Sequence, residues 1–159
     1  PYRRARILAF LNPEADIQGT GYQAYQSFIA VGTGGLTGLG LGDGRQKLFF
    51  LPYPYTDFIY AIVGEELGLI GCAIVLGLFG MVFARAMRAA VNAPDPFGRL
   101  LGTGLAVMIV VQALVNISVV LALLPTKGIP LPFISYGGSA LWADLIAVGI
   151  LLNVSQHAP

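Results

Sequence analysis

The sequence predicts an all-α integral membrane protein, a polytopic helical bundle with three membrane spans in 159 residues. Composition is the first reason, because 56% of the residues are hydrophobic and only 11% are charged, outside the usual range of soluble domains. Length is the second reason. Three apolar stretches reach or approach the roughly 20 residues that a helix needs to cross about 30 Å of hydrocarbon.

The chain starts with a long loop over residues 1–57. Residues 19–32 within it have the apolar spacing of about three helical turns, which predicts a short helix at the membrane interface or packed on the bundle. Residues 32–44 are rich in glycine but lack the GxxxxGK[ST] pattern and a preceding strand. We therefore interpret them as a compact turn and not as a nucleotide site.

Arg45, Gln46 and Lys47 follow the glycines and precede aromatic residues at the expected membrane surface. They have two interpretations. Cations at this depth anchor a chain at the interface. The second interpretation is a binding site for a lipid pyrophosphate, because Arg and Lys neutralise phosphate while aromatic side chains lie at headgroup level.

The first predicted span covers residues 58–84, with Asp57 at its start. A lone acid there is either a helix N-cap or first-turn residue, stabilised by free backbone N–H groups, or a group that does chemistry at the membrane surface. Glu65 lies about 12 Å further along a helix that starts at Asp57. The two carboxylates are therefore not a glycosidase-like pair, whose members stand roughly 5 to 9.5 Å apart.

Glu65 and Glu66 lie inside this span. Ionisable residues within a span face a bundle interior or cavity more often than lipid, so we expect these two to line a polar interior or to cap another helix. Gly64 and Gly68 form a small-xxx-small pattern, which predicts that a neighbouring helix approaches this part of the span closely.

A loop over residues 85–99 leads to the second predicted span, residues 100–124. This span has no charged residue. Its polar residues include Gln112 and Asn116, which are types that hydrogen-bond across helices within a bundle.

The next loop, residues 125–138, is apolar but interrupted by prolines. Non-helical backbone at membrane depth persists only where protein or a watery cavity satisfies it. The loop is therefore predicted to fold back against the bundle and to bring Lys127 to the face that holds Asp57. The last predicted span, residues 139–154, is short and contains Asp144, which requires tilt or protein neighbours around its carboxylate.

Residues 155–159 form a short tail. Lys and Arg in loops favour the cytoplasmic side of a membrane, but here they give opposite orientations of the bundle with and without the long first loop. The charges therefore leave the orientation of the bundle in the membrane open. Cys72 and His157 occur singly, which gives no support for a disulfide framework or a His-based metal site. Because no Met or signal-peptide pattern starts the chain, we expect it to be part of a larger protein.

Three segments resemble one family of membrane proteins. They read GLGDGRQKLFFLP (residues 40–52), TDFIYAIVGEELG (56–68) and LLPTKGIPLPFISYGGS (123–139). The chain resembles the SEDS family of FtsW, RodA and SpoVE over nearly its whole length, and the cell-division member more than the elongation member. The resemblance implies a ten-helix protein of which this chain is the carboxyl-terminal part. It places residues 1–57 and 125–138 outside the cell and residues 85–99 and the tail inside.

The resemblance also implies an activity, which is polymerisation of lipid II by a peptidoglycan glycosyltransferase at the outer face of the bacterial plasma membrane, at the division septum. It implies a class B penicillin-binding protein and other divisome membrane proteins as partners, and no nucleic acid. Asp57 is expected to act as the general base of an inverting transfer. Mg²⁺ or Mn²⁺ is a candidate cofactor, and the sequence identifies no residues as its ligands. Substrate contacts are expected from Arg45, Gln46, Lys47, Lys127 and Ser135, and roles in the polar interior from Glu65, Glu66 and Asn116.

Two other functions stay open from the sequence. One is a flippase for the lipid-linked precursor, with Glu65, Glu66 and Asp144 along a polar pathway. The other is a scaffold whose helices dock and activate a partner. Within the family, a member that serves elongation or sporulation is the alternative to the division member.

Overall fold

The structure is a computed structural model that describes residues 22–40, 42, 57–125 and 128–157. Its helices are α2 (Tyr22–Gly34), α4 (Ile59–Val91), α5 (Pro96–Val120) and α6 (Gly138–Gln156). Three of them, α4, α5 and α6, are long and apolar enough to cross a membrane. The described residues contain no strand. The predicted class, an all-α polytopic membrane protein, is confirmed.

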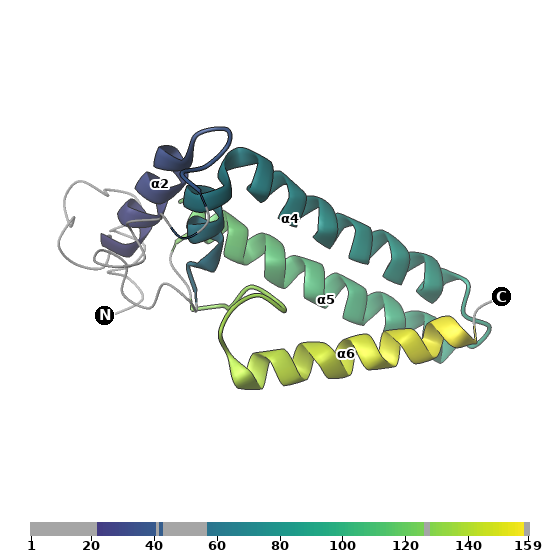
Figure 1. The fold of residues 1–159 in the computed structure, drawn as a ribbon. Helices are drawn as coiled ribbons and strands as arrows, with labels where there is room; N and C mark the ends of the chain where they lie inside the picture. The colour runs from purple at the N-terminus through teal and green to yellow at the C-terminus, as the bar shows by residue number, and fades with distance from the viewer. Residues whose placement is uncertain (1–21, 41, 43–56, 126–127, 158–159) are drawn as a thin grey trace, which may run out of the picture.

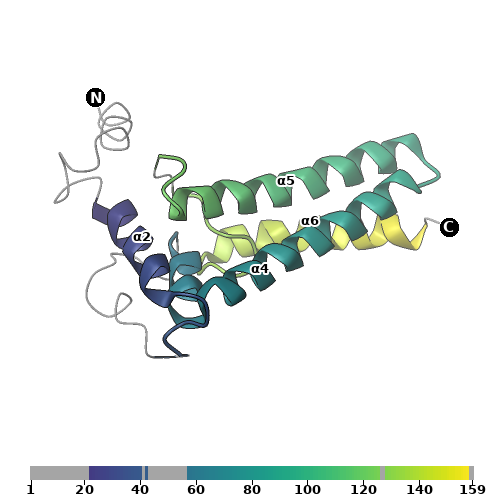
Figure 2. The same ribbon diagram turned by 90° about the horizontal axis from the view of Figure 1, so that it is seen from above.

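The three long helices lie side by side and alternate in direction (Figures 1 and 2). Residues 92–95 connect α4 to α5, and α6 then runs back in the direction of α4. The start of α4, residues 121–125 and 128–137, and the start of α6 therefore share one end of the bundle, which we call the loop end. Helix α2 packs against α4 at this end.

The helix ends differ from the expected ones around residues 85–99. Helix α4 continues through Arg85 and Arg88 to Val91, so the predicted loop is reduced to residues 92–95. The sequence between 81 and 93 contains no Gly or Pro. Arginine is also a good helix former whose charged end reaches water while its stem covers apolar surface.

The ends of α5 also have local causes. The side chain of Asp95 accepts a hydrogen bond from the Gly98 N–H (2.9 Å) as an N-cap, and proline occupies the first helical position. The helix ends at Val120, before the expected residue 124, because Ala122 takes a left-handed conformation with φ 55°. Helix α6 keeps within two residues of the expected 139–154 span.

Helix α4 is broken inside its apolar part, at Gly68 (φ 65°, ψ −162°). A break leaves backbone groups without helical partners, and the bilayer interior offers no water to satisfy them. The loop over residues 35–40 supplies partners through four backbone hydrogen bonds. They run from Leu69 N–H to Gly35 C=O (3.0 Å), Ile70 to Leu36 (3.3 Å), Leu39 to Glu65 (3.0 Å) and Gly40 to Glu66 (3.1 Å).

Glycine makes this close approach possible. A side chain on Gly38, whose φ is 80°, would overlap the carbonyl of Glu66, and one on Gly34 would overlap the carbonyl of Gly64. The predicted close packing at Gly64 and Gly68 is therefore confirmed, and the neighbour is α2 with the loop that follows it. The glycine-rich run is a compact turn over its described part, as expected.

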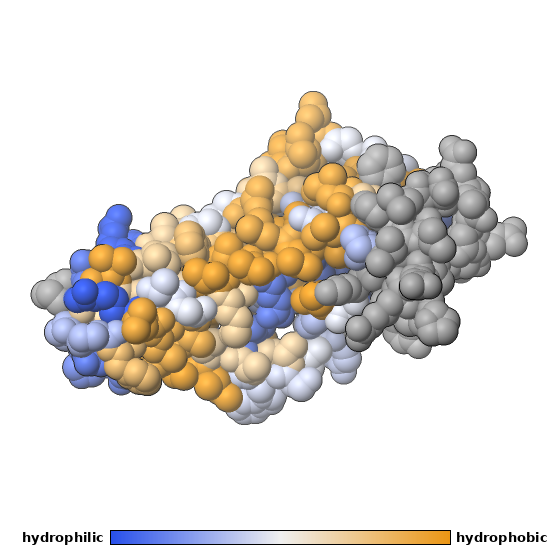
Figure 3. All heavy atoms as spheres, turned by 180° about the vertical axis from the view of Figure 1, so that it is seen from behind, coloured by the Kyte–Doolittle hydropathy of each residue, from blue (hydrophilic) through white to orange (hydrophobic). Residues whose placement is uncertain are grey.

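Large apolar side chains are exposed on all three long helices, and they form broad patches on the face shown in Figure 3. Examples are Leu69, Ile74 and Met81 on α4 and Trp142 on α6, all more than half exposed. Surfaces of this kind in a soluble domain would cause association, whereas lipid or further helices cover them in a bilayer.

Candidate functional site

Asp57 lies at the loop end, in the turn before α4, and it is half-buried. Phe58 holds the N-cap position, and the first turn of α4 has no acidic residue. Asp57 therefore lies one residue before the N-cap position, outside the cap and the first turn that were expected for it. The carboxylate instead lies beside Gly128, where an added Cβ would come within 3.1 Å of Asp57 Oδ2.

Two amides on one face of α5 hold the 125–138 loop against the bundle. Asn116 Nδ2 donates to the backbone carbonyls of Asp57 (2.9 Å) and Ile129 (2.7 Å). One turn earlier, Gln112 Nε2 donates to the carbonyl of Pro130 (3.1 Å). The prediction that this loop folds back toward Asp57 is confirmed for its described residues. The backbone carbonyls of this loop need donors from the protein, because the membrane interior offers them no water.

The same loop is held internally by Ser135 and at its base by Asp144. Ser135 Oγ accepts a hydrogen bond from the Leu131 N–H (2.8 Å), and the side chain is buried. The Asp144 carboxylate is 3% exposed and lies near the backbone N–H of Phe133. Asp144 thus has the protein neighbours that its place in a short span requires. The expected contact between Ser135 and substrate stays a prediction.

Replacing Ser135 by Ala should destabilise the loop. The buried Leu131 N–H would lose its acceptor, at a cost of about 1–3 kcal/mol. Thermal unfolding of the full-length protein in detergent measures this effect, with Ser139→Ala on exposed α6 surface as the control. A loss of stability with an unchanged KM for lipid II would assign Ser135 to the loop alone. A raised KM would support the substrate contact.

The remaining predicted site residues fall into two groups. Arg45, Gln46, Lys47 and Lys127 lie outside the described residues. Glu65 and Glu66 lie at the break in α4, where Glu65 is 1% exposed and Glu66 is half-buried. Their backbone carbonyls pair with the 35–40 loop, which places both residues with the break and not with Asp57.

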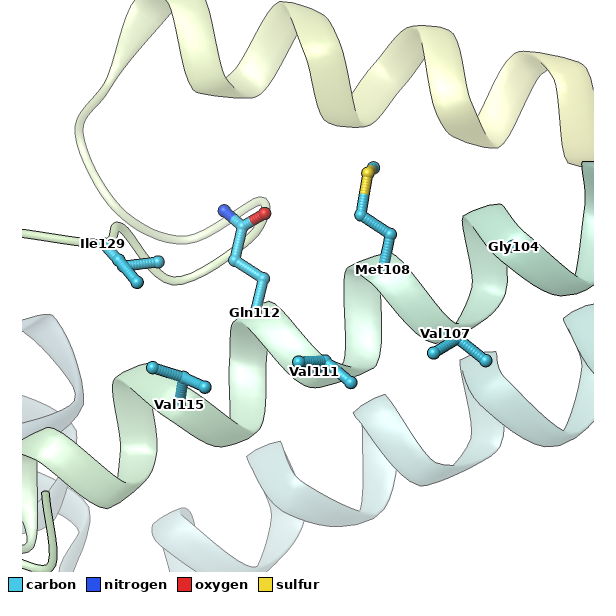
Figure 4. Close-up of a pocket in the computed structure, with 7 residues that line it drawn as sticks. All are labelled: Gly104, Val107, Met108, Val111, Gln112, Val115 and Ile129. Atoms are coloured by element: carbon cyan, nitrogen blue, oxygen red, sulfur yellow. The ribbon is translucent and has the colours of Figure 1, made fainter.

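Two hollows flank the 125–138 loop. One, of about 540 Å³, runs along α5 between Gly104 and Ile129 (Figure 4). Val107, Met108 and Val111 make it apolar, and the polar side chain in its lining is Gln112. The other, of about 490 Å³, lies between Ile59 and the loop and has Ser135, Tyr136 and Leu141 in its lining. Both hollows therefore combine apolar side chains with residues of this loop.

The site has the chemistry of a single carboxylate. An ionised carboxylate accepts hydrogen bonds and can take a proton from a hydroxyl group within reach. Across the described ranges, no group of three or more His, Cys, Asp or Glu side chains comes together as metal ligands. Gly128 and the amides on α5 were not identified from the sequence as neighbours of Asp57. The spacing of Gln112 and Asn116, four residues apart on one helix face, was the available signal.

Fold and site together define a multi-pass helical membrane protein with a half-buried carboxylate at one end of its bundle. The chain belongs to the FtsW, RodA and SpoVE family, since the family model described as "Cell cycle protein" matches residues 1–159.

Relatives and a solved structure agree with this family. The chain is 58% identical over 98% of its length to the "Probable peptidoglycan glycosyltransferase FtsW" of Geobacter metallireducens, and 52% identical over 99% to the "Stage V sporulation protein E" of Bacillus subtilis. A chain in a structure described as "Structural coordination of polymerization and crosslinking by a peptidoglycan synthase complex" matches 98% of this chain with a TM-score of 0.75 and 33% identity. This chain spans 42%, 43% and 42% of the lengths of those three proteins.

Proposed function

We propose that the full-length protein is a peptidoglycan glycosyltransferase that polymerises lipid II, with Asp57 as its general base. The observation that carries this proposal is the place of Asp57, a half-buried carboxylate beside Gly128 at the loop end. The name of the Geobacter metallireducens relative, a probable peptidoglycan glycosyltransferase, supports the same reaction class.

The proposed reaction is an inverting displacement. Asp57 takes the proton of the acceptor sugar 4-hydroxyl as its oxygen attacks the anomeric carbon of the donor sugar. The bond to the lipid pyrophosphate breaks, and the pyrophosphate leaves with its electron pair. Base catalysis of this kind contributes typically about 10²- to 10⁴-fold.

Charge on the leaving pyrophosphate would be offset by Arg45, Lys47 and Lys127, cations outside the described residues. The residue that follows Lys127 in the chain is Gly128, which lies beside the Asp57 carboxylate. Mg²⁺ or Mn²⁺ would supply further charge stabilisation. Asp57 suits such an ion as one ligand, because Mg²⁺ is commonly held by one or two carboxylates together with substrate phosphates.

We place the loop end outside the cell and the 92–95 connection inside. Arg85, Arg88 and Arg99, which are exposed near that connection, agree with this orientation when only the charges near short connections are counted. We further propose a class B penicillin-binding protein and other divisome membrane proteins as partners at the septum. The solved neighbour, a peptidoglycan synthase complex of polymerization and crosslinking, supports a partner of this kind.

Polymerisation of labelled lipid II by the purified full-length protein with its penicillin-binding partner tests the proposal. We expect glycan strands to form in detergent, where no membrane separates two compartments. Lipid II that crosses a vesicle bilayer without forming strands would favour the flippase. The scaffold would be favoured if the partner formed strands at the normal rate together with an Asp57 variant of this protein.

A further inference from the structure

Asn116 joins two distant parts of the chain at the loop end. Its side chain is 2% exposed, near the end of α5. The same nitrogen, Nδ2, donates to the carbonyl of Asp57, 59 residues earlier, and to that of Ile129, 13 residues later. One amide therefore connects the turn that carries the carboxylate with the loop that lies beside it.

Chemistry fixes the orientation of this amide. Both neighbours are carbonyl oxygens, so the donor nitrogen must face them and a flipped amide would set oxygen against oxygen. The remaining atom, Asn116 Oδ1, is buried without a hydrogen-bond partner in the part of the chain that the structure describes. A buried acceptor left unpaired is a cost in stability.

We propose that Asn116 is a positioning residue for Asp57. Through its two hydrogen bonds it sets the distance between the Asp57 backbone and the 128–129 segment, and thereby the place of the carboxylate beside Gly128. This inference rests on the proposed glycosyltransferase function. In such a reaction a displacement of the base by about 1 Å costs roughly 100-fold in rate.

The geometry makes Asn116 different from the other amide on the same helix face. Gln112 also donates from α5 to the loop, but among the described residues its one partner is the Pro130 carbonyl. Gln112 therefore holds the loop without a bond to the Asp57 turn. Asn116 alone among the described hydrogen bonds of α5 side chains links both segments.

The test compares Asn116→Leu with Gln112→Leu in the full-length protein, using lipid II polymerisation with the penicillin-binding partner. We expect kcat of Asn116→Leu to fall about 10- to 100-fold while KM for lipid II stays within about twofold, because the base is displaced and the substrate contacts remain. Gln112→Leu should lose less than about threefold in kcat, since it lacks the bond to Asp57.

A second variant covers the case in which Asn116→Leu does not fold. Asn116→Asp keeps the size of the side chain, and its neutral acid donates to one of the two carbonyls. Its kcat should lie between those of the wild type and Asn116→Leu, with KM unchanged. Adding Asn116→Asp to Asp57→Asn should cause no further loss, because a positioning residue acts only through the group that it positions.

Wild-type kcat in the Asn116 variants, or an equal loss in Gln112→Leu, would overturn the positioning role. A rise in KM with kcat unchanged would also overturn it, in favour of a substrate contact. Wild-type protein that makes no polymer would instead overturn the proposed function, and this inference with it. The wild-type reaction therefore separates the two failures.

Discussion

Replacing Asp57 by Asn is expected to lower kcat for lipid II polymerisation by about 10²- to 10⁴-fold. Asn keeps the size of the side chain but cannot accept the proton of the acceptor hydroxyl. The bond from Asn116 goes to the Asp57 backbone carbonyl, so the substitution leaves that contact in place. The folded turn should therefore persist, and KM for lipid II should change little.

Asp95→Asn is the matched control for this change. Asp95 lies at the opposite end of the bundle, where its side chain caps α5 by accepting from the Gly98 N–H. Asn is an equally good N-cap, so this variant should fold and polymerise as the wild type does. A normal rate in Asp57→Asn would return Asp57 to a structural role, and the search for the base would turn to Glu65 and Glu66.

The spans could be predicted because their signal is local. Apolar length and the scarcity of charge identify a membrane helix whatever surrounds it. Asp57 was chosen as a candidate for a similar reason, as a lone acid at the start of an apolar run. The loop after α5 was predicted to fold back because prolines at membrane depth leave carbonyls that need protein donors.

The features that the sequence did not show depend on distant partners. The hydrogen bond from Asn116 to the Asp57 carbonyl joins residues 59 apart, and a polar residue within a span does not reveal its partner. Helix α4 runs through Arg85 and Arg88 because arginine favours helix as well as the membrane surface. Counting these charges as loop residues was the cause of the wrong boundary.

The break in α4 also depends on a distant partner that the local sequence does not reveal. The Gly64 and Gly68 pattern predicted a close neighbour, which the structure confirms, but it did not predict a left-handed residue inside the span. No proline marks the position. The break depends on a loop about 30 residues earlier, whose backbone groups replace the helical partners.

Gly68→Ala should therefore strongly destabilise the fold. Backbone angles of 65° and −162° lie in a region that is essentially restricted to glycine, and a side chain there costs about 1–3 kcal/mol from conformation alone. The added Cβ would also lie 2.6 Å from the carbonyl oxygen of Leu36 and closer still to the nitrogen of Gly38. The 35–40 loop would have to move, and four backbone hydrogen bonds would be lost with it.

Thermal unfolding of the full-length protein in detergent, together with its amount in membranes, measures this loss. Gly77→Ala in the same helix is the control, because a Cβ at Gly77 meets nothing within 4 Å and alanine favours the helical state by about 0.5–1 kcal/mol. We expect the control to unfold at or slightly above the wild-type temperature and Gly68→Ala well below it. Equal temperatures for the two variants would mean that α4 can close its break into a continuous helix, and that the glycine-rich loop is not needed to satisfy the backbone there.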